Sequence, residues 1–157
     1  MNRQRIYEII CVVALIIFIA FMSAESVYSD KTAAEVAESV TQSYDVSELS
    51  QIKRNKIKED FGIDFVGVDS FVYYASDSIM NVDELMIIKL KEDVKPEEIS
   101  ERIEKRVKDK QVLFEGYAPE QSALLKEYVL TEDKGFIFYA VGEDAREAYA
   151  AFKSSIR

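Results

Sequence analysis

The sequence has no histidine, and its single cysteine, Cys11, lies inside an apolar run near the N-terminus. Zinc sites draw on cysteine and histidine, the usual serine and cysteine triads need a histidine base, and a disulfide bond needs two thiols. The absence of these residues excludes most familiar catalytic and metal sites. Carboxylate chemistry or binding remains, and we predict no catalytic residue set, no metal and no cofactor.

Glycine and proline are also scarce, with five and two residues in a chain of 157. Hydrophobic residues make up 48% of the chain and charged residues 31%, which is the composition of a folded globular protein and not of a disordered tail. The length leaves room for one ordinary domain and a short appendage.

Positive charge is in the minority, and the formal net charge is −9. The first 24 residues carry +1, from Arg3 and Arg5 against Glu8, so the remainder carries −10. An acidic body repels phosphodiester backbones and anionic lipid headgroups. We therefore expect no nucleic acid partner.

An uncharged apolar segment follows the first basic residues. Arg3 and Arg5 precede a run without charge from Ile9 to Ala24. Basic residues on the cytoplasmic side of an apolar run are the pattern of a signal anchor. We therefore predict a single transmembrane helix within residues 1–24, a cytoplasmic N-terminus and an extracellular C-terminal domain.

Two other fates of this segment differ from an anchor. Cleavage as a signal peptide would release a secreted protein, but Met22-Ser23-Ala24 supplies one of the two small residues wanted at the cleavage positions. Lipidation needs a cysteine just after the apolar run, whereas Cys11 lies near its beginning. The anchor is favoured, secretion after cleavage stays open as the alternative, and lipidation is not expected.

The rest of the chain divides into a juxtamembrane helix in residues 25–43 and one domain in residues 44–157. Apolar residues at helical spacing predict the first helix over about 31–42, beginning at Ser29 or Asp30. β-branched and aromatic runs predict two strand pairs, the second turning at Gly135, with a helix after each pair. The first strand pair, the long helix and the final helix cover residues 69–76, 83–91, 96–114 and 143–156.

Strand pairs that are separated by a helix favour an antiparallel sheet. We predict an α+β fold in which the N-terminal transmembrane helix is followed by an antiparallel sheet of about four strands, with helices packed on one face. The order of elements in the body is helix, two strands, helix, two strands, helix.

The sequence FEGYAPEQ, residues 114–121, interrupts the charged pattern of the long helix. Phe114 continues the apolar face of the helix, and Gly116 is predicted to end it in a left-handed conformation. Pro119 prevents simple continuation but allows a new turn to start at Glu120. Tyr117 then either fills a gap in the core or marks a binding surface, and the first interpretation is favoured.

Arg106 lies on the apolar face of the long helix, seven residues after Ile99. A guanidinium there must find an acceptor, so Arg106 either pairs with an acid of the sheet, such as Glu84, or contacts an anion or a partner. These two residues, with Tyr74 in a strand and Tyr117 after the helix, form our candidate partner or ligand surface. Convergence of Arg106, Glu84 and Tyr117 in a concave pocket would favour ligand binding.

Four carboxylates near the candidate surface raise the question of hydrolysis by a carboxylate pair. Asp83 and Glu84 at a strand entry, with Glu115 and Glu120 near the helix end, would need a cleft that raises the pKa of one of them. Acidic residues are abundant throughout this chain, so we interpret this grouping as chance.

The stretch RVKDKQVLFEGYAPE, with DELMIIK before it and KGFIF after it, resembles a bacterial domain-of-unknown-function family numbered 4358. The resemblance covers about residues 44–156, and Lys110 stands where the family has glutamine. It implies a small secreted or membrane-tethered protein of Gram-positive, clostridium-type bacteria, with many lipoproteins among its relatives, and it implies no activity. The residues that match the family pattern are Arg106, Phe114, Tyr117 and Pro119.

We therefore expect a membrane-anchored extracytoplasmic protein that is not an enzyme and acts as an interaction or accessory module at the cell envelope. Its expected partners are the membrane, through the N-terminal helix, and another envelope protein or a cell-wall glycan. A glycan- or peptide-binding module and a carboxylate-based envelope hydrolase are the alternatives.

Overall fold

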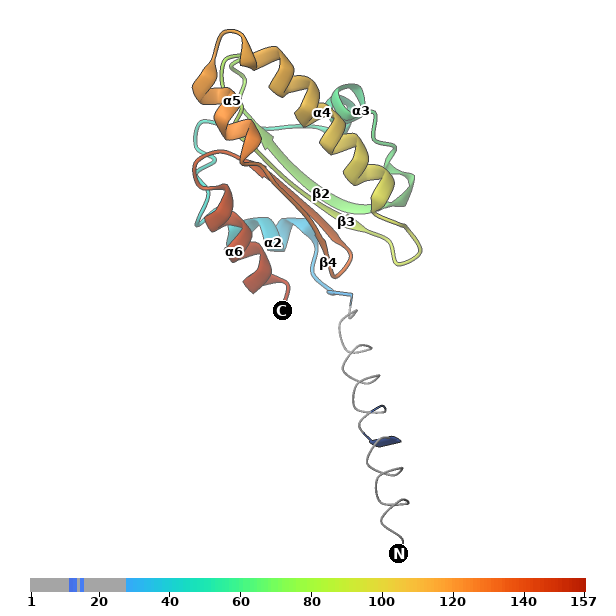
Figure 1. Cartoon of the computed structure of the whole chain (residues 1–157). Helices are drawn as coiled ribbons and strands as arrows, with labels where there is room; N and C mark the ends of the chain where they lie inside the picture. Colours follow the sequence, from blue (N-terminus) through green and yellow to red (C-terminus); the bar gives the residue numbers. More distant parts are fainter. Residues whose placement is uncertain (1–11, 14, 16–27) are drawn as a thin grey trace, which may run out of the picture.

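The structure is a computed structural model that describes residues 28–157 together with Val12, Val13 and Leu15 (Figure 1). Apart from these three residues, the transmembrane helix predicted within residues 1–24 lies outside the described part of the chain. No helix among the residues that are described is long and apolar enough to cross a membrane.

Residues 28–157 form five α-helices, one short 3₁₀-helix and one sheet. The helices are α2 (Ala33–Val40), α3 (Arg54–Phe61), α4 (Glu97–Glu115), α5 (Pro119–Lys126) and α6 (Ala145–Ser155), with the 3₁₀ turn η1 at Phe65–Gly67. The strands are β1 (Ser50–Gln51), β2 (Val68–Ala75), β3 (Glu84–Leu90), β4 (Val129–Asp133) and β5 (Phe136–Val141).

The five strands form one antiparallel sheet in the order β1-β2-β3-β5-β4. The predicted α+β class and both strand pairs are therefore confirmed. The second pair turns at Lys134 and Gly135, which both have positive φ, as the tight turn of a two-residue hairpin requires. The predicted number of strands omits β1, whose two residues are too few to produce a recognisable pattern.

Helices cover both faces of the sheet, so the predicted packing on one face is wrong. In Figure 1, α3, α4 and α5 lie above the sheet, and α2 and α6 lie below it. The first layer packs on Met86 and Ile88 of β3, and the second packs on Leu85 and Ile87 of the same strand.

The physical reason lies in the central strands. Every residue of β3, ELMIIKL, and of β5, FIFYAV, is buried. Successive side chains of a strand point to opposite faces, so the apolar run 85–88 of β3 and the whole of β5 need cover on both faces. The second cover comes from α2, whose buried residues pack with those of α6 in one cluster. The helix that the sequence places beside the membrane is therefore part of the domain core.

The ends of the helices differ from the prediction in three places. The N-cap of α2 is Thr32, which forms a capping box with Glu35, and not Ser29 or Asp30. Gly116 has a φ of −86°, so α4 does not end in a left-handed residue. Pro119 starts α5, so the new turn that the sequence predicts at Glu120 extends to an eight-residue helix.

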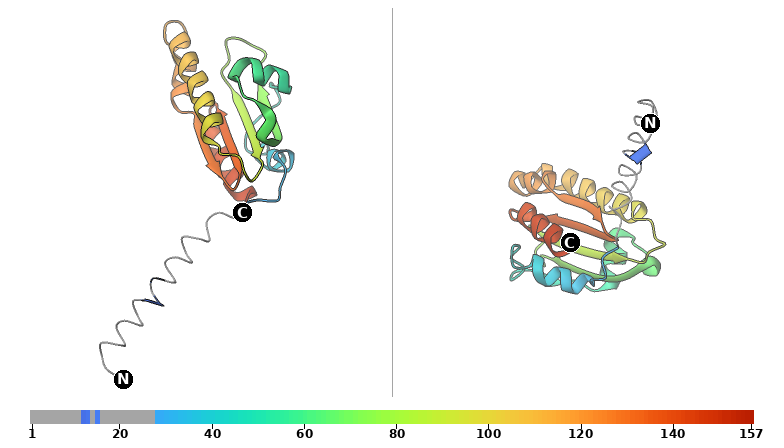
Figure 2. Two further views of the ribbon diagram at one scale, coloured as in Figure 1. Left: turned by 90° about the vertical axis from the view of Figure 1, so that its right-hand side faces the viewer. Right: turned by 90° about the horizontal axis from the view of Figure 1, so that it is seen from below.

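The two ends of the sheet carry different parts of the chain. The β2–β3 loop and the α4–α5 turn lie at one end, and the β4–β5 turn and the C-terminus lie at the other (Figure 2). Tyr28 belongs to the second end, because its hydroxyl donates to the Glu92 carbonyl and the Ser29 amide donates to the Lys134 carbonyl.

Phe138→Ala tests the second layer. Phe138 is fully buried on the α6 face of β5 and stacks on Phe152 with 4.8 Å between ring centroids. We expect its truncation to lower the free energy of unfolding by about 3–5 kcal/mol in urea denaturation. Val66→Ala, at an exposed residue, should cost less than about 0.5 kcal/mol. Equal small losses would contradict the two-faced core.

Candidate functional site

A pocket of about 410 Å³ opens between α3, α4 and the β2–β3 loop, and we call it the α3–α4 pocket. It contains two of the four predicted site residues, Glu84 and Arg106. The lining residues are Ile52, Lys56, Asp60, Tyr73, Ala75, Ser76, Asp77, Ser78, Ile79, Asn81, Glu84, Arg106, Lys110, Leu113 and Phe114.

Glu84, the first residue of β3, forms the charged floor of this pocket. Arg106 donates to both carboxylate oxygens, with Nη1 and Nη2 each 2.8 Å from its acceptor. Lys110 Nζ lies 2.7 Å from Oε1, and the Tyr139 hydroxyl donates to Oε2 over 2.8 Å. One carboxylate therefore accepts four hydrogen bonds from α4 and β5.

These contacts determine the charge state of Glu84, which is 2% exposed. Burial by itself would raise its pKa, but Arg106 and Lys110 outweigh burial and lower the pKa of Glu84. Burial and the nearby carboxylate raise the pKa of Tyr139 well above its usual value. The floor thus holds an ionised carboxylate beside a neutral phenol at neutral pH.

Local sequence explains how the cations reach the floor. Ile103 and Val107 are buried on the face of α4 that meets the sheet, and Arg106 and Lys110 lie one helical turn apart beside them. The Arg106 guanidinium lies 4.2 Å from the centre of the Phe61 ring of α3, which shields it from water. The predicted pairing of Arg106 with Glu84 is confirmed.

Two exposed apolar side chains line this pocket, and we call them the apolar rim. They are Ile79 of the β2–β3 loop, which is 87% exposed, and Leu113 near the end of α4, which is 61% exposed. Met80, Val112 and Tyr117 are also exposed, but they are not among the residues that line the pocket.

The other two predicted site residues do not meet on the pocket floor. Tyr117 is 52% exposed and packs its ring 5.2 Å from that of Phe114, so the interpretation that it fills the core is wrong. Tyr74 packs in the α2–α6 layer, on the opposite face of the sheet from Arg106. Since neighbouring strand residues alternate between faces, Tyr73 and not Tyr74 lines the pocket.

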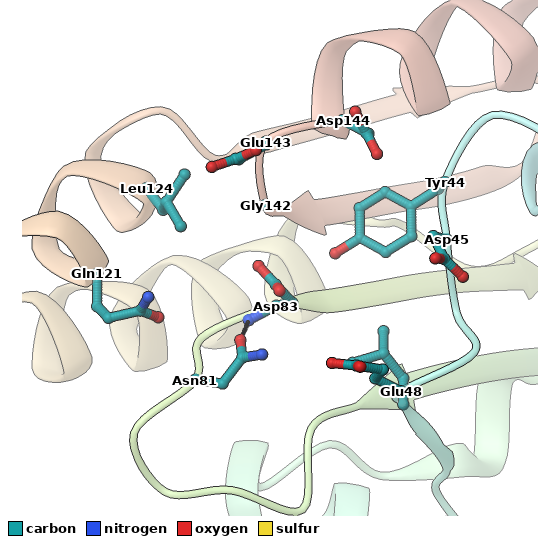
Figure 3. Close-up of a pocket in the computed structure, with 11 residues that line it drawn as sticks. Tyr44, Asp45, Glu48, Asn81, Asp83, Gln121, Leu124, Gly142, Glu143 and Asp144 are labelled. Carbon is teal, nitrogen blue, oxygen red and sulfur yellow. Dashed lines mark hydrogen bonds between the residues drawn. The ribbon is translucent and has the colours of Figure 1, made fainter.

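A second pocket, of about 270 Å³, lies at the same end of the sheet and is rich in acidic residues (Figure 3). Asp83, Glu143 and Asp144 line it together with Tyr44, whose hydroxyl donates to the Val141 carbonyl. Partial burial raises the pKa of Asp83, and Glu143 and Asp144 add to this effect. Sequence reasoning found Asp83 but did not group it with the other acids of the pocket, because Asp45 and Glu48 precede it and Glu143 and Asp144 follow it far along the chain.

The grouping of carboxylates that the sequence analysis interprets as chance does not form one site. Asp83 lines the acidic pocket and Glu84 lines the α3–α4 pocket, whereas Glu115 and Glu120 line neither. Glu115 instead forms an exposed ion pair with Lys126. Within the described residues, no group of three or more histidine, cysteine, aspartate or glutamate side chains has the geometry to hold a metal ion.

A family model described as Domain of unknown function (DUF4358) matches residues 42–142. The chain belongs to this family. The match includes the whole sheet of the DUF4358 protein and the α3, α4 and α5 layer, while α2 and α6 fall outside it. Comparison with curated proteins and with solved structures gave no match.

Glu84→Gln tests the floor of the DUF4358 domain. Removing the charge leaves Arg106 partly buried without its anion, so we expect a loss of about 3–5 kcal/mol in the free energy of unfolding at pH 7. Because the pKa of Glu84 is lowered by folding, its stabilisation is present above its unfolded pKa, about 4.3, and disappears as pH falls through the folded value.

The matched control is Glu98→Gln, which removes an exposed i,i+4 partner of Arg102 on the same helix and should cost under about 0.5 kcal/mol. Urea denaturation between pH 7 and pH 3 measures both variants. A Glu84→Gln protein as stable as the Glu98→Gln protein at pH 7 would contradict the assigned role of the floor.

Asp83→Asn tests the acidic pocket. An acid whose pKa is raised by folding contributes stability below its unfolded pKa, about 3.9, and that contribution is lost as pH rises through the folded value. We therefore expect the variant to unfold at a higher urea concentration than the wild type at pH 7, and to lose this advantage near pH 3. Asp93→Asn, at an exposed position, is the control. An Asp83→Asn protein that is weaker at both pH values would refute this assignment.

Proposed function

We propose that this DUF4358 protein is a tethered, non-enzymatic interaction or accessory module of the cell envelope. Residues 1–24 hold the chain in the membrane, and the domain lies outside it. The end of the sheet that carries the α3–α4 pocket and the apolar rim contacts the partner, another envelope protein or a cell-wall glycan. The exposure of the apolar rim is the observation that supports this proposal most directly.

Ile79 and Leu113 place exposed apolar surface at the pocket. Exposed apolar side chains beside a pocket are a surface that protein and ligand interfaces use. Tyr117 adds an exposed aromatic ring, a side-chain type that is enriched at interfaces. The packing of Tyr117 on Phe114 fixes the position of this ring, so less conformational entropy is lost when a partner binds.

The position of the rim in the domain agrees with a membrane anchor at the N-terminus. Tyr28, the first residue of the described domain, contacts Glu92 and the Gly135 turn at one end of the sheet. The β2–β3 loop and the end of α4 lie at the opposite end (Figure 1). A chain that leaves the membrane before Tyr28 would therefore direct the rim away from the bilayer.

A carboxylate-based hydrolase or a binding module for a cationic glycan or peptide is the second candidate, and the acidic pocket favours it. A carboxyl group whose pKa is raised by burial and by neighbouring acids is the arrangement that general acid catalysis uses. Hydrolysis of cell-wall fragments that is lost in Asp83→Asn, with folding retained, would support this candidate over the first.

Site-specific crosslinking tests the proposed interaction surface. A photoreactive amino acid at Leu113, on the rim, should capture a discrete partner in native membranes, while one at Lys95, exposed at the other end of α4, should not. Ile79→Asp should reduce capture from position 113 several-fold, because it places a charge on the apolar contact. Equal capture of a partner from both positions would contradict the proposal.

Topology is tested by a reporter fused after Arg157. An enzyme that is active only outside the cytoplasm should be active in this fusion, and it should remain in the membrane fraction after a carbonate wash. Cytoplasmic reporter activity would contradict the proposed orientation, and release into the medium would favour signal cleavage.

A further inference from the structure

We propose that the α3–α4 pocket binds an organic carboxylate that carries an apolar group, with the carboxylate on Lys110 and the apolar group against Ile79 and Leu113. The proposal deepens the proposed function and rests on it for the biological setting, since it names the chemistry that the same end of the domain recognises. The pocket geometry supports it independently.

The charge balance of the floor is the first argument. Arg106 and Lys110 contribute two positive charges, while Glu84 contributes one negative charge. Arg106 already satisfies both oxygens of Glu84 in a bidentate pair, so Lys110 is the surplus cation. A ligand with one negative charge would neutralise this surplus.

Access to Lys110 is the second argument. Its side chain is 22% exposed, and within the described part of the chain its Nζ has one acceptor, Glu84 Oε1 at 2.7 Å. An ammonium group has three donors, so further N–H groups remain for a ligand. A carboxylate that reaches Lys110 would gain charge-assisted hydrogen bonds in a partly desolvated site.

The remaining charged residues of the lining are Lys56, Asp60 and Asp77, so the formal charge of the whole lining is zero and the positive surplus is confined to the floor. Lys56 Nζ lies 2.8 Å from Asp60, so these two charges cancel. Asp77 accepts a hydrogen bond from the Ser50 hydroxyl over 2.5 Å. These acids would repel a ligand with two negative charges, whereas the cations of the floor disfavour an amine. A monoanion satisfies both restrictions.

The walls of the pocket determine the rest of the ligand. They are mainly apolar, and the volume of about 410 Å³ lies within the ordinary range for small-molecule sites. A short aliphatic or aromatic group would remove apolar wall surface from water as it binds. The apolar wall residues are Ile52, Tyr73, Ala75, Ile79, Leu113 and Phe114.

Binding of defined carboxylates to the full chain in lipid nanodiscs tests the proposal. The probes are hexanoate and an acetylated tripeptide that ends in leucine, each compared with its own amide, with empty nanodiscs as the blank. We expect at least one acid to bind about tenfold or more tightly than its amide in calorimetric titrations, because the amide lacks the charge. Binding of the peptide acid alone would assign the site to a polypeptide C-terminus.

Variants of α4 connect this binding to the pocket. Lys110→Gln should weaken the binding of the acids about tenfold and leave the binding of the amides unchanged. Lys110→Arg should restore the affinity for the acids to within a few-fold of the wild type. Lys108→Gln, on the solvent face of the same helix, is the matched control and should bind as the wild type. Leu113→Asp, at an exposed position, should also weaken the binding of the acids, because it places a negative charge in the pocket.

Two results would overturn the proposal: equal affinity for acids and amides, or no binding of either acid. Crosslinking from position 113 provides a separate readout of the proposed function. If position 113 captures a partner but no carboxylate binds, only this inference fails. If a carboxylate binds but no partner is captured, the inference on the pocket stands and the proposed function as an interaction module fails.

Discussion

The buried carboxylate of Glu84 is the interaction on which the arrangement of this domain depends. An ionised group so far from water is tolerated only with opposite charge and hydrogen bonds around it. Arg106, Lys110 and Tyr139 supply them from α4 and β5. The requirement fixes α4 on the sheet, places two cations on one acid, and creates a pocket floor with excess positive charge.

The sheet divides the interior into two apolar layers with different roles. The α3, α4 and α5 layer contains the polar floor and the pocket, while the α2 and α6 layer is made of aliphatic and aromatic side chains. The family match covers the first layer and the sheet but neither helix of the second. In this chain, the second layer closes the face that β3 and β5 would otherwise expose.

Much of the fold follows from local pattern. The strand pairs, α4 and its start near Pro96 agree with the structure because propensity, capping and turn chemistry act over a few residues. The second helical layer was missed although the unbroken runs of β3 and β5 signal it. The left-handed conformation predicted for Gly116 is wrong because a glycine after a helix can also have a negative φ. The buried position predicted for Tyr117 is wrong because its exposure depends on where α5 packs.

The sequence by itself determined the chemistry available to this protein: no histidine, one cysteine, an acidic body, and an arginine on an apolar helix face that requires an anion. It also favoured an acid of the sheet as the partner of Arg106 over an external anion or partner, and the structure decided for Glu84. Tertiary structure decided that Lys110 and Tyr139 share that acid, that Tyr74 faces the other layer, and that Ile79 and Leu113 line one pocket. The contacts to Glu84 join residues 22 to 55 positions apart, and the spacing of residues within one helix or strand does not reveal such contacts.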